Sequence, residues 1–153
     1  MTRSLHDQAR KAVVLMVEDN LDHAFLVRAA FEESAPHVEL HHVVSGDHCM
    51  AWLRREQPYQ AASRPDLILL DLHMPRMNGY EVMQEIRKDE TLAALVVVAL
   101  TTSTEPADVD LLYRLGCNSY LAKPVSFQGF IEMAKALSSY WFQRAVLPTN
   151  TQA

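Results

Sequence analysis

The stretch that decides the fold is LILLDLHMP, from Leu67 to Pro75. It opens on a continuous aliphatic run without polar alternation, which is typical of a strand buried on both faces of a parallel sheet. The run ends at the carboxylate of Asp71. In open α/β sheets, ligands bind outside the carboxyl ends of the strands, so this acid is a candidate for chemistry. Taken alone, Asp71 is explained at least as well as a helix cap or a solvated turn residue.

The composition describes one globular domain. With 153 residues and 49% hydrophobic content the chain can bury a proper core, and we expect a domain over 11–147 between tails at 1–10 and 148–153. A formal net charge of -5 leaves no basic surplus for nucleic acid. The polar amino end and the lack of a long apolar run predict a cytoplasmic protein without membrane attachment. Cys49 and Cys117 match no metal or disulfide pattern and are expected to be buried free thiols.

Apolar runs and the breaks between them predict five strands alternating with five helices. The segment 38–44 alternates in polarity, which is typical of an edge strand. Asn20 can cap a helix, and Asn78 with Glu81 forms a capping box. The expected strands are 12–17, 38–44, 67–70, 94–100 and 119–122, and the expected helices are 21–33, 45–55, 78–88, 106–115 and 126 onward. This alternation requires right-handed crossovers and therefore a doubly wound parallel α/β sheet.

Polar residues follow four of the predicted strands. The carboxyl ends of parallel strands share one edge of the sheet, so these residues are expected to form one site. They are Glu18, Asp19, Asp71, Thr101 and Lys123. Crowded carboxylates repel one another unless a cation intervenes, and a hard divalent ion is the natural counter-charge. Magnesium suits this set better than zinc, since no Cys or suitably spaced His pair accompanies the acids.

These residue types suit transfer of a phosphoryl group. Asp71 would be the nucleophile, while Asp19 would bind the metal directly and Glu18 would assist through water or by charge. Lys123 would pair with one phosphoryl oxygen as a flexible point charge. Thr101 would donate its hydroxyl to another oxygen. Together they predict an acceptor that uses a metal and a lysine without further catalytic groups.

Four blocks of the sequence resemble the signature of response-regulator receiver domains. They are Val17–Asn20, Leu70–Pro75 with Asn78-Gly79, Ala99–Thr101 and Tyr120–Pro124, in the family's order and spacing. The resemblance spans nearly the whole chain. It implies a flavodoxin-like (CheY-like) five-stranded sheet of order 2-1-3-4-5. It also implies an aspartyl phosphate at Asp71, a Mg²⁺ (or Mn²⁺) ion bound by Asp19, Asp71 and the backbone carbonyl of His73, and a cis peptide between Lys123 and Pro124.

The resemblance further assigns a switch and residues that tune it. Thr101 would move toward the phosphoryl group and the Tyr120 ring would turn inward, changing a surface formed by the fourth helix, the fifth strand and the fifth helix. Tyr120 can equally be an ordinary half-buried strand aromatic. His73, Ser103 and Thr102 would set the lifetime of the phosphoryl group, and the bulk of Thr102 would hinder small phosphodonors. Glu18 stands where the family more often has Asp.

The carboxyl-terminal helix carries aromatic residues beyond the usual receiver end. Tyr140, Trp141 and Phe142 predict a partner or dimer surface, or else a helix that covers the sheet's own edge. This extension resembles single-domain response regulators that pair with bacterial phytochromes. That subfamily implies homodimers through the fourth helix (106–115) and the fifth (126 onward), with a light-regulated histidine kinase as partner. No output domain is expected to follow.

Two other function classes fit part of the pattern. A magnesium-dependent phosphatase of the haloacid dehalogenase type also uses an aspartyl nucleophile after a strand, but His73 stands where its second acid belongs. The chain could also be an adaptor with a receiver fold that works without phosphorylation. Repeated turnover of para-nitrophenyl phosphate would favour the phosphatase. Failure to label with a competent kinase and magnesium would favour the adaptor.

Overall fold

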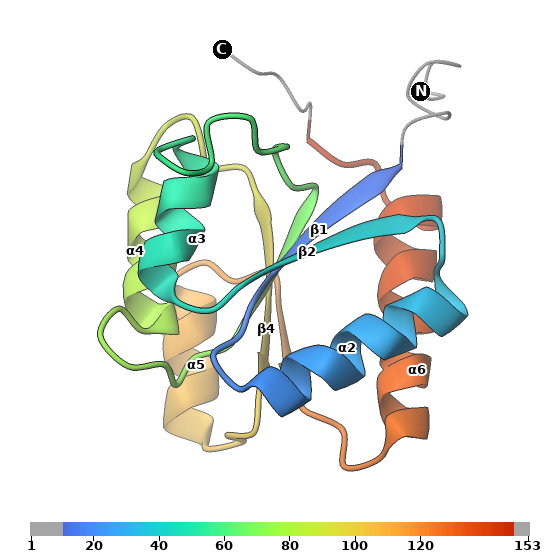
Figure 1. Ribbon diagram of the computed structural model, residues 1–153. Helices are drawn as coiled ribbons and strands as arrows, with labels where there is room; N and C mark the ends of the chain where they lie inside the picture. Colours follow the sequence, from blue (N-terminus) through green and yellow to red (C-terminus); the bar gives the residue numbers. More distant parts are fainter. Residues whose placement is uncertain (1–10, 149–153) are drawn as a thin grey trace.

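The computed structural model describes residues 11–148. The predicted tail at 1–10, and the one at 148–153 apart from Pro148, lie outside the described residues. A parallel five-stranded sheet has the order β2-β1-β3-β4-β5 and carries helices on both faces (Figure 1). The strands are β1 (Ala12–Val17), β2 (Val38–Val43), β3 (Leu67–Leu70), β4 (Val96–Thr101) and β5 (Ser119–Ala122). The helices are α2 (Leu21–Ser34), α3 (Gly46–Leu53), α4 (Gly79–Lys88), α5 (Pro106–Arg114) and α6 (Phe127–Leu137), which continues into the π-helix η1 (Ser138–Arg144).

The central strand β3 divides the core into two layers. Side chains of successive strand residues point to opposite faces, so Ile68 and Leu70 pack with α3, α4 and α5. Leu67 and Leu69 pack instead with α2 and α6. Figure 1 shows the same division, with α3 to α5 on one side of the sheet and α2 and α6 on the other. All four residues are buried, which confirms the predicted two-sided strand.

Polar side chains cap the N-termini of helices that begin near the carboxyl ends of the strands. The Asn20 side chain accepts a hydrogen bond from the His23 N–H, and Asn78 and Glu81 form the predicted capping box. Gly79 follows at a close approach, since a Cβ there would lie 2.6 Å from the carbonyl oxygen of Asp71. The α4 helix therefore begins directly beside the candidate site.

The structure shifts several of the predicted boundaries. The α3 helix ends at Leu53 rather than 55, because Arg55 has a left-handed backbone with φ of 54°. Strand β4 runs from Val96 to Thr101, two residues later than its predicted start and one beyond its predicted end. Strand β2 does lie at the sheet edge. Cys49 and Cys117 are buried free thiols, as expected. Over residues 11–148, no helix is long and apolar enough to cross a membrane.

Candidate functional site

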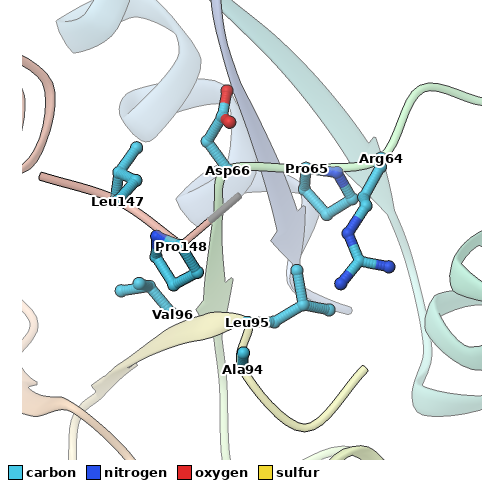
Figure 2. Close-up of a pocket in the computed structure, with 8 residues that line it drawn as sticks. All are labelled: Arg64, Pro65, Asp66, Ala94, Leu95, Val96, Leu147 and Pro148. Atoms are coloured by element: carbon cyan, nitrogen blue, oxygen red, sulfur yellow. The ribbon is translucent and has the colours of Figure 1, made fainter. Parts of the chain in front are cut away.

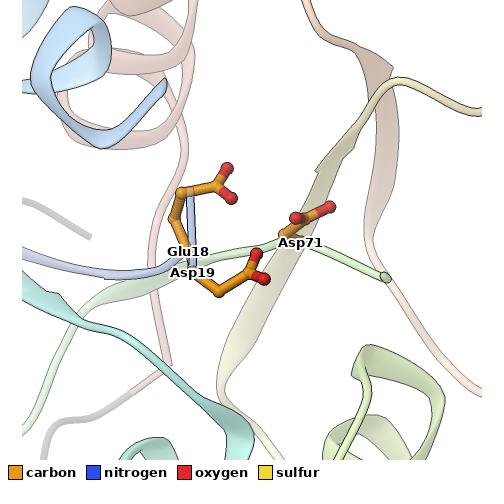
Figure 3. Close-up of side chains that lie close together, drawn as sticks. All are labelled: Glu18, Asp19 and Asp71. Carbon is orange, nitrogen blue, oxygen red and sulfur yellow. The ribbon is translucent and has the colours of Figure 1, made fainter. Parts of the chain in front are cut away.

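Three carboxylates gather where β1 and β3 end. Glu18 and Asp19 follow β1, and Asp71 follows β3; the two strands pair in parallel, with Val17 opposite Leu70. One carboxylate oxygen from each acid lies within 4.8 Å of the others, and Figure 3 shows them around a common space. Glu18 and Asp71 are buried and Asp19 is exposed. The cluster predicted from the strand order is thus present.

The ammonium of Lys123 lies within this cluster. Its Nζ is 2.6 Å from Oε1 of Glu18 and 3.6 Å from Oδ2 of Asp71. The Lys123 side chain is only 5% exposed, so both contacts are largely shielded from water. Its backbone N–H donates to the carbonyl of Thr101, which extends the pairing of β4 and β5 by one residue. The last strand therefore delivers the lysine to Asp71, as the sequence predicted.

Burial dominates the electrostatics of Glu18. It raises the pKa of this carboxyl to about 7, against the opposing hydrogen bond from Lys123, and the nearby Asp71 charge raises it further. The Asn20 N–H donates to its carboxylate at 3.1 Å. The His42 ring lies 2.7 Å from the Glu18 carbonyl oxygen, which anchors the backbone. A carboxyl group whose pKa lies near 7 can release its proton readily when a cation binds.

The donor set fits a hard divalent cation. The cluster of Glu18, Asp19 and Asp71 offers only oxygen ligands, which Mg²⁺ and Mn²⁺ accept and zinc sites seldom use alone. One lysine does not neutralise three carboxylates, so a divalent ion would also relieve their repulsion. These residues can therefore hold a divalent metal ion, with the exposed Asp19 on the side open to solvent.

Thr101 ends β4, the strand beside β3, and is fully buried. Its Oγ1 is a buried side-chain polar atom with no hydrogen-bond partner among the described residues. A buried hydroxyl without a partner is costly, and such groups in native structures generally have a role. The hydroxyl is available to an oxygen-rich group added at the neighbouring strand end.

Comparison with known proteins decides the family. The sequence model of the response regulator receiver domain matches residues 14–135. This chain belongs to the response regulator receiver family. It is therefore a signalling protein of the two-component type. The predicted family and fold class are both confirmed.

Receivers linked to phytochromes are among its relatives. Response regulator Rcp1 of Synechocystis sp. is 36% identical over 136 residues, which cover 89% of this chain and 92% of Rcp1. The phosphorylated cyanobacterial phytochrome response regulator RcpA is 37% identical, has a TM-score of 0.85, and aligns over 91% of this chain and 99% of its own. The Mn²⁺-bound form of Rcp1 is 36% identical, has a TM-score of 0.82, and aligns over 90% of this chain and 99% of its own.

One expectation drawn from the receiver resemblance is wrong. Among the described residues the cis peptide is Gln57–Pro58, so the bond between Lys123 and Pro124 is trans. The two isomers before proline differ by only about 0.5–1 kcal/mol, so tertiary contacts rather than the local sequence select one. Lys123 therefore reaches the acid cluster although its peptide bond to Pro124 is trans.

The loop after β4 is held by a hydrogen-bond network. The Tyr120 hydroxyl donates to the Ser103 carbonyl at 2.8 Å, while the Ser103 hydroxyl donates to Asp108 at 2.6 Å. The Tyr80 hydroxyl donates to the other Asp108 oxygen at 2.6 Å. These bonds, led by the one from Ser103, lower the pKa of Asp108. The Asp108 carboxylate thus joins α4 to α5, and Ser103 links it to Tyr120 of β5.

Sequence reasoning missed two residues of this receiver site. Asp108 lies in the first turn of α5, and nothing in the sequence marks it as the acceptor for two hydroxyls. His23 lies in the first turn of α2, with Nδ1 2.9 Å from the Nζ of Lys123. Its position just beyond the end of β1 was a usable signal, because that end lies at the same sheet edge. The predicted lifetime residues His73 and Thr102 are exposed, whereas Ser103 is half-buried.

The aromatic extension is divided between the protein core and solvent. Trp141 and Phe142 are half-buried and pack against the core layer under α2 and α6. Tyr140 is 57% exposed and meets the Trp141 ring edge-on, with ring centroids 4.9 Å apart. The alternative interpretation, a helix that covers the sheet's own edge, therefore applies to Trp141 and Phe142. Tyr140 remains exposed to solvent.

A small cavity lies at the opposite edge of the receiver sheet. Figure 2 shows it lined by Arg64, Pro65, Asp66, Ala94, Leu95, Val96, Leu147 and Pro148. It precedes β3 and β4, whereas the acid cluster follows β1 and β3. Its volume is about 20 Å³, which holds roughly one water molecule. This cavity is too small for an organic ligand.

Proposed function

We propose that this receiver accepts a phosphoryl group from a histidine kinase onto Asp71. The observation that carries the proposal is the enclosed ammonium of Lys123, 3.6 Å from the Asp71 carboxylate. Charge on the transferring oxygens must be neutralised for phosphoryl transfer, and this ammonium is placed to do so. The unpartnered Thr101 hydroxyl adds a donor for a further oxygen. Phosphorylation of the related RcpA supports the same conclusion.

The transfer step follows from the chemistry of the acceptor. A carboxylate oxygen of Asp71 forms the new bond to phosphorus while the P–N bond of the donor's phosphohistidine breaks. The electron pair stays on the imidazole nitrogen, which takes up a proton. Lys123 holds one phosphoryl oxygen. Hydrolysis or return of the group to the kinase would end the signal, and the receiver itself would catalyse both.

A divalent ion bound at the acid cluster would supply charge neutralisation for this transfer. Asp19, Asp71 and the backbone carbonyl of His73 would hold it, and Glu18 would act indirectly. The Mn²⁺-bound form of the related Rcp1 supports a site of this class. Because Asp19 is exposed, its carboxylate can exchange bound water for the metal ion without any opening of the core.

The phosphoryl group would be read through the loop after β4. Movement of the Thr101 hydroxyl toward the new oxygens would displace the loop that holds the Tyr120 hydroxyl. The ring would then turn inward and alter the surface of α5, β5 and α6. His73, Thr102 and Ser103 would set how long the group survives.

The partners we propose are a sensor kinase and a second copy of this chain. A cytoplasmic histidine kinase of the phytochrome type is supported by the phytochrome relationship of RcpA. Homodimerisation through α5 and α6 is supported by exposed apolar residues there. These are Leu111 and Tyr113 on α5, Phe127 at the start of α6 and Tyr140 beyond it.

Substitution of the acceptor tests the proposal. The parent, incubated with Mg²⁺ and a competent phosphorylated kinase, should gain one hydroxylamine-labile phosphate. Asp71→Asn should gain none while keeping its circular dichroism spectrum. Labelling of Asp71→Asn would overturn the acceptor assignment. A parent that never labels, with every kinase of the same genome tested, would favour a phosphorylation-independent adaptor.

A second variant tests the role of the lysine. Lys123→Ala should uncouple occupancy from output, because the phosphoryl oxygen loses its charged partner. Partner affinity, measured with and without phosphorylation, should then no longer change. Affinity that still responds as in the parent would contradict this role.

A further inference from the structure

We propose that His23 is a positioning residue for phosphoryl transfer, which directs the ammonium of Lys123 toward Asp71. The proposal rests on the proposed function, since it concerns the same site. Its basis is the contact between Nδ1 of His23 and Nζ of Lys123, at 2.9 Å. The two residues lie 100 positions apart in the sequence, so only the fold brings them together.

The contact fixes one of the three donors that an ammonium carries. Lysine can only donate, so Nδ1 of His23 accepts and the ring proton sits on Nε2. A second donor of Lys123 meets Glu18 at 2.6 Å. The third donor points toward Asp71, but the distance of 3.6 Å between Nζ and Oδ2 of Asp71 is too long for a good hydrogen bond. This third N–H is therefore available to donate a hydrogen bond to a phosphoryl oxygen on Asp71.

An uncharged acceptor has an advantage over a carboxylate at this position. The site already holds Glu18, Asp19 and Asp71, and a fourth acid would repel an incoming phosphoryl group. A neutral imidazole satisfies the buried donor without cancelling the charge that the phosphoryl oxygens need. An apolar side chain at position 23 would leave that donor without a protein partner and the ammonium free to turn away.

The helix holds the His23 ring in place. His23 is the third residue of α2, and its N–H donates to the Asn20 side chain at 3.0 Å. The next turns of α2 bury Ala24 and Val27 against the sheet. Because both the helix cap and the core fix the backbone here, Nδ1 is presented to Lys123 from a rigid element.

Three substitutions separate the hydrogen bond from the bulk of the ring. In His23→Asn the amide oxygen can take the place of Nδ1, whereas His23→Gln carries its oxygen one bond further out and His23→Ala has no acceptor. The measured quantity is the rate at which the full chain gains hydroxylamine-labile phosphate from phosphoramidate with saturating Mg²⁺. This donor avoids any effect on kinase docking. His23→Ala and His23→Gln should be about tenfold slower than the parent, as expected for a hydrogen bond to a charged group, and His23→Asn should be within about twofold.

His48→Ala is the matched control. His48 is also the third residue of its helix, and its N–H also donates to a capping side chain, that of Ser45. Its ring contacts the Tyr59 hydroxyl rather than the acid cluster. We expect its phosphorylation rate to equal that of the parent.

A second readout does not depend on phosphorylation. The Lys123 ammonium should give a slowly exchanging ¹⁵N–¹H signal in the parent and in His23→Asn, identified by its loss in Lys123→Ala. That signal should broaden or vanish in His23→Ala. A signal unchanged in His23→Ala, or an Asn variant as slow as the Ala variant, would overturn the positioning role. If the parent took up phosphate neither from phosphoramidate nor from a competent kinase, the proposed function would fail, and the ammonium signal alone would decide whether His23 positions Lys123.

Discussion

Thr101 shows how a single residue can be costly to the fold and useful to the site. Its hydroxyl is buried without a partner among the described residues, whereas the exposed Thr102 next to it can be hydrated. Leaving a buried hydroxyl unpaired costs about 1–3 kcal/mol. A phosphoryl oxygen on Asp71 would supply an acceptor and remove this cost, so Thr101 would favour the proposed phosphorylated state.

Replacing this hydroxyl by a methyl group separates stability from signalling. Thr101→Val should leave the free energy of unfolding unchanged or raise it by about 1 kcal/mol, because an isosteric group replaces an unpaired polar one. The same variant should lose the phosphorylation-dependent change in partner affinity. Urea denaturation and binding titrations measure the two effects, with Thr102→Val as control. A clear loss of stability would mean that the Thr101 hydroxyl has a partner in solution.

Glu18 makes the metal-free protein sensitive to pH. Its pKa is raised from 4.5 to about 7 by burial, so between these values the folded state binds more protons than the unfolded state. Its contribution to stability is therefore complete below pH 4.5 and is lost as the pH rises through 7. In EDTA, the parent relative to Glu18→Gln should lose about 3 kcal/mol between pH 4.5 and 7.5. Urea denaturation of both proteins measures this difference.

Metal should reverse that trend. Magnesium binds the ionised carboxylates, so it should stabilise the parent more at pH 7.5 than at pH 5. Equal stabilisation at both values, or a parent and Glu18→Gln with parallel pH profiles in EDTA, would contradict the raised pKa.

At the scale of elements, Arg87 joins the end of α4 to two strands. Its guanidinium donates to the carbonyls of Gly116, Ala93 and Leu95, at 2.7 to 3.0 Å, and to the Asn118 side chain at 3.1 Å. These groups directly precede β4 and β5, so the planar guanidinium fork of Arg87 fixes the position of the chain at the start of both strands. Gly116, with φ of 103°, turns the chain so that its carbonyl reaches the guanidinium.

Removal of this fork should destabilise the domain. Arg87→Met keeps the aliphatic stem but leaves several carbonyls without their donor, so we expect a loss of about 2–3 kcal/mol in the free energy of unfolding. Arg87→Lys should recover little, since one ammonium cannot span the same acceptors. Lys88→Met, a change at an exposed neighbour, is the control in the same urea titration. An Arg87→Met variant as stable as Lys88→Met would show that the fork adds nothing.

At the scale of the whole molecule, the aromatic extension both completes the core and leaves one residue outside it. Trp141 and Phe142 cover the layer under α2 and α6, while Tyr140 projects to solvent beside them. A charge at Trp141 would damage the monomer before it reported on any dimer. Tyr140 is therefore the residue whose substitution tests association.

Tyr140→Glu should weaken a homodimer built on α5 and α6. An exposed carboxylate costs the monomer little but is repelled by its copy across a two-fold interface. Sedimentation velocity should show the variant shifted toward monomer at concentrations where the parent is dimeric. A matched substitution elsewhere, Phe25→Glu on the exposed face of α2, should not change the distribution. Identical profiles for Tyr140→Glu and the parent would remove Tyr140 from the interface.

The sequence by itself determined the elements and the edge at which the chemistry gathers. The aliphatic run before Asp71, the caps at Asn20 and Asn78, and the polar residues after four strands suffice for this, because periodicity and capping are local and parallel strands end together. The motif blocks then identified the receiver family.

Only the tertiary structure decided the contacts that distinguish this receiver. It placed His23 against Lys123, turned Trp141 onto the core, and fixed the peptide before Pro124 as trans. The placement of His23 and of Trp141 depends on packing between segments far apart in the chain. The competing local arrangements differ by about a kcal/mol or less, so the local sequence could not choose between them.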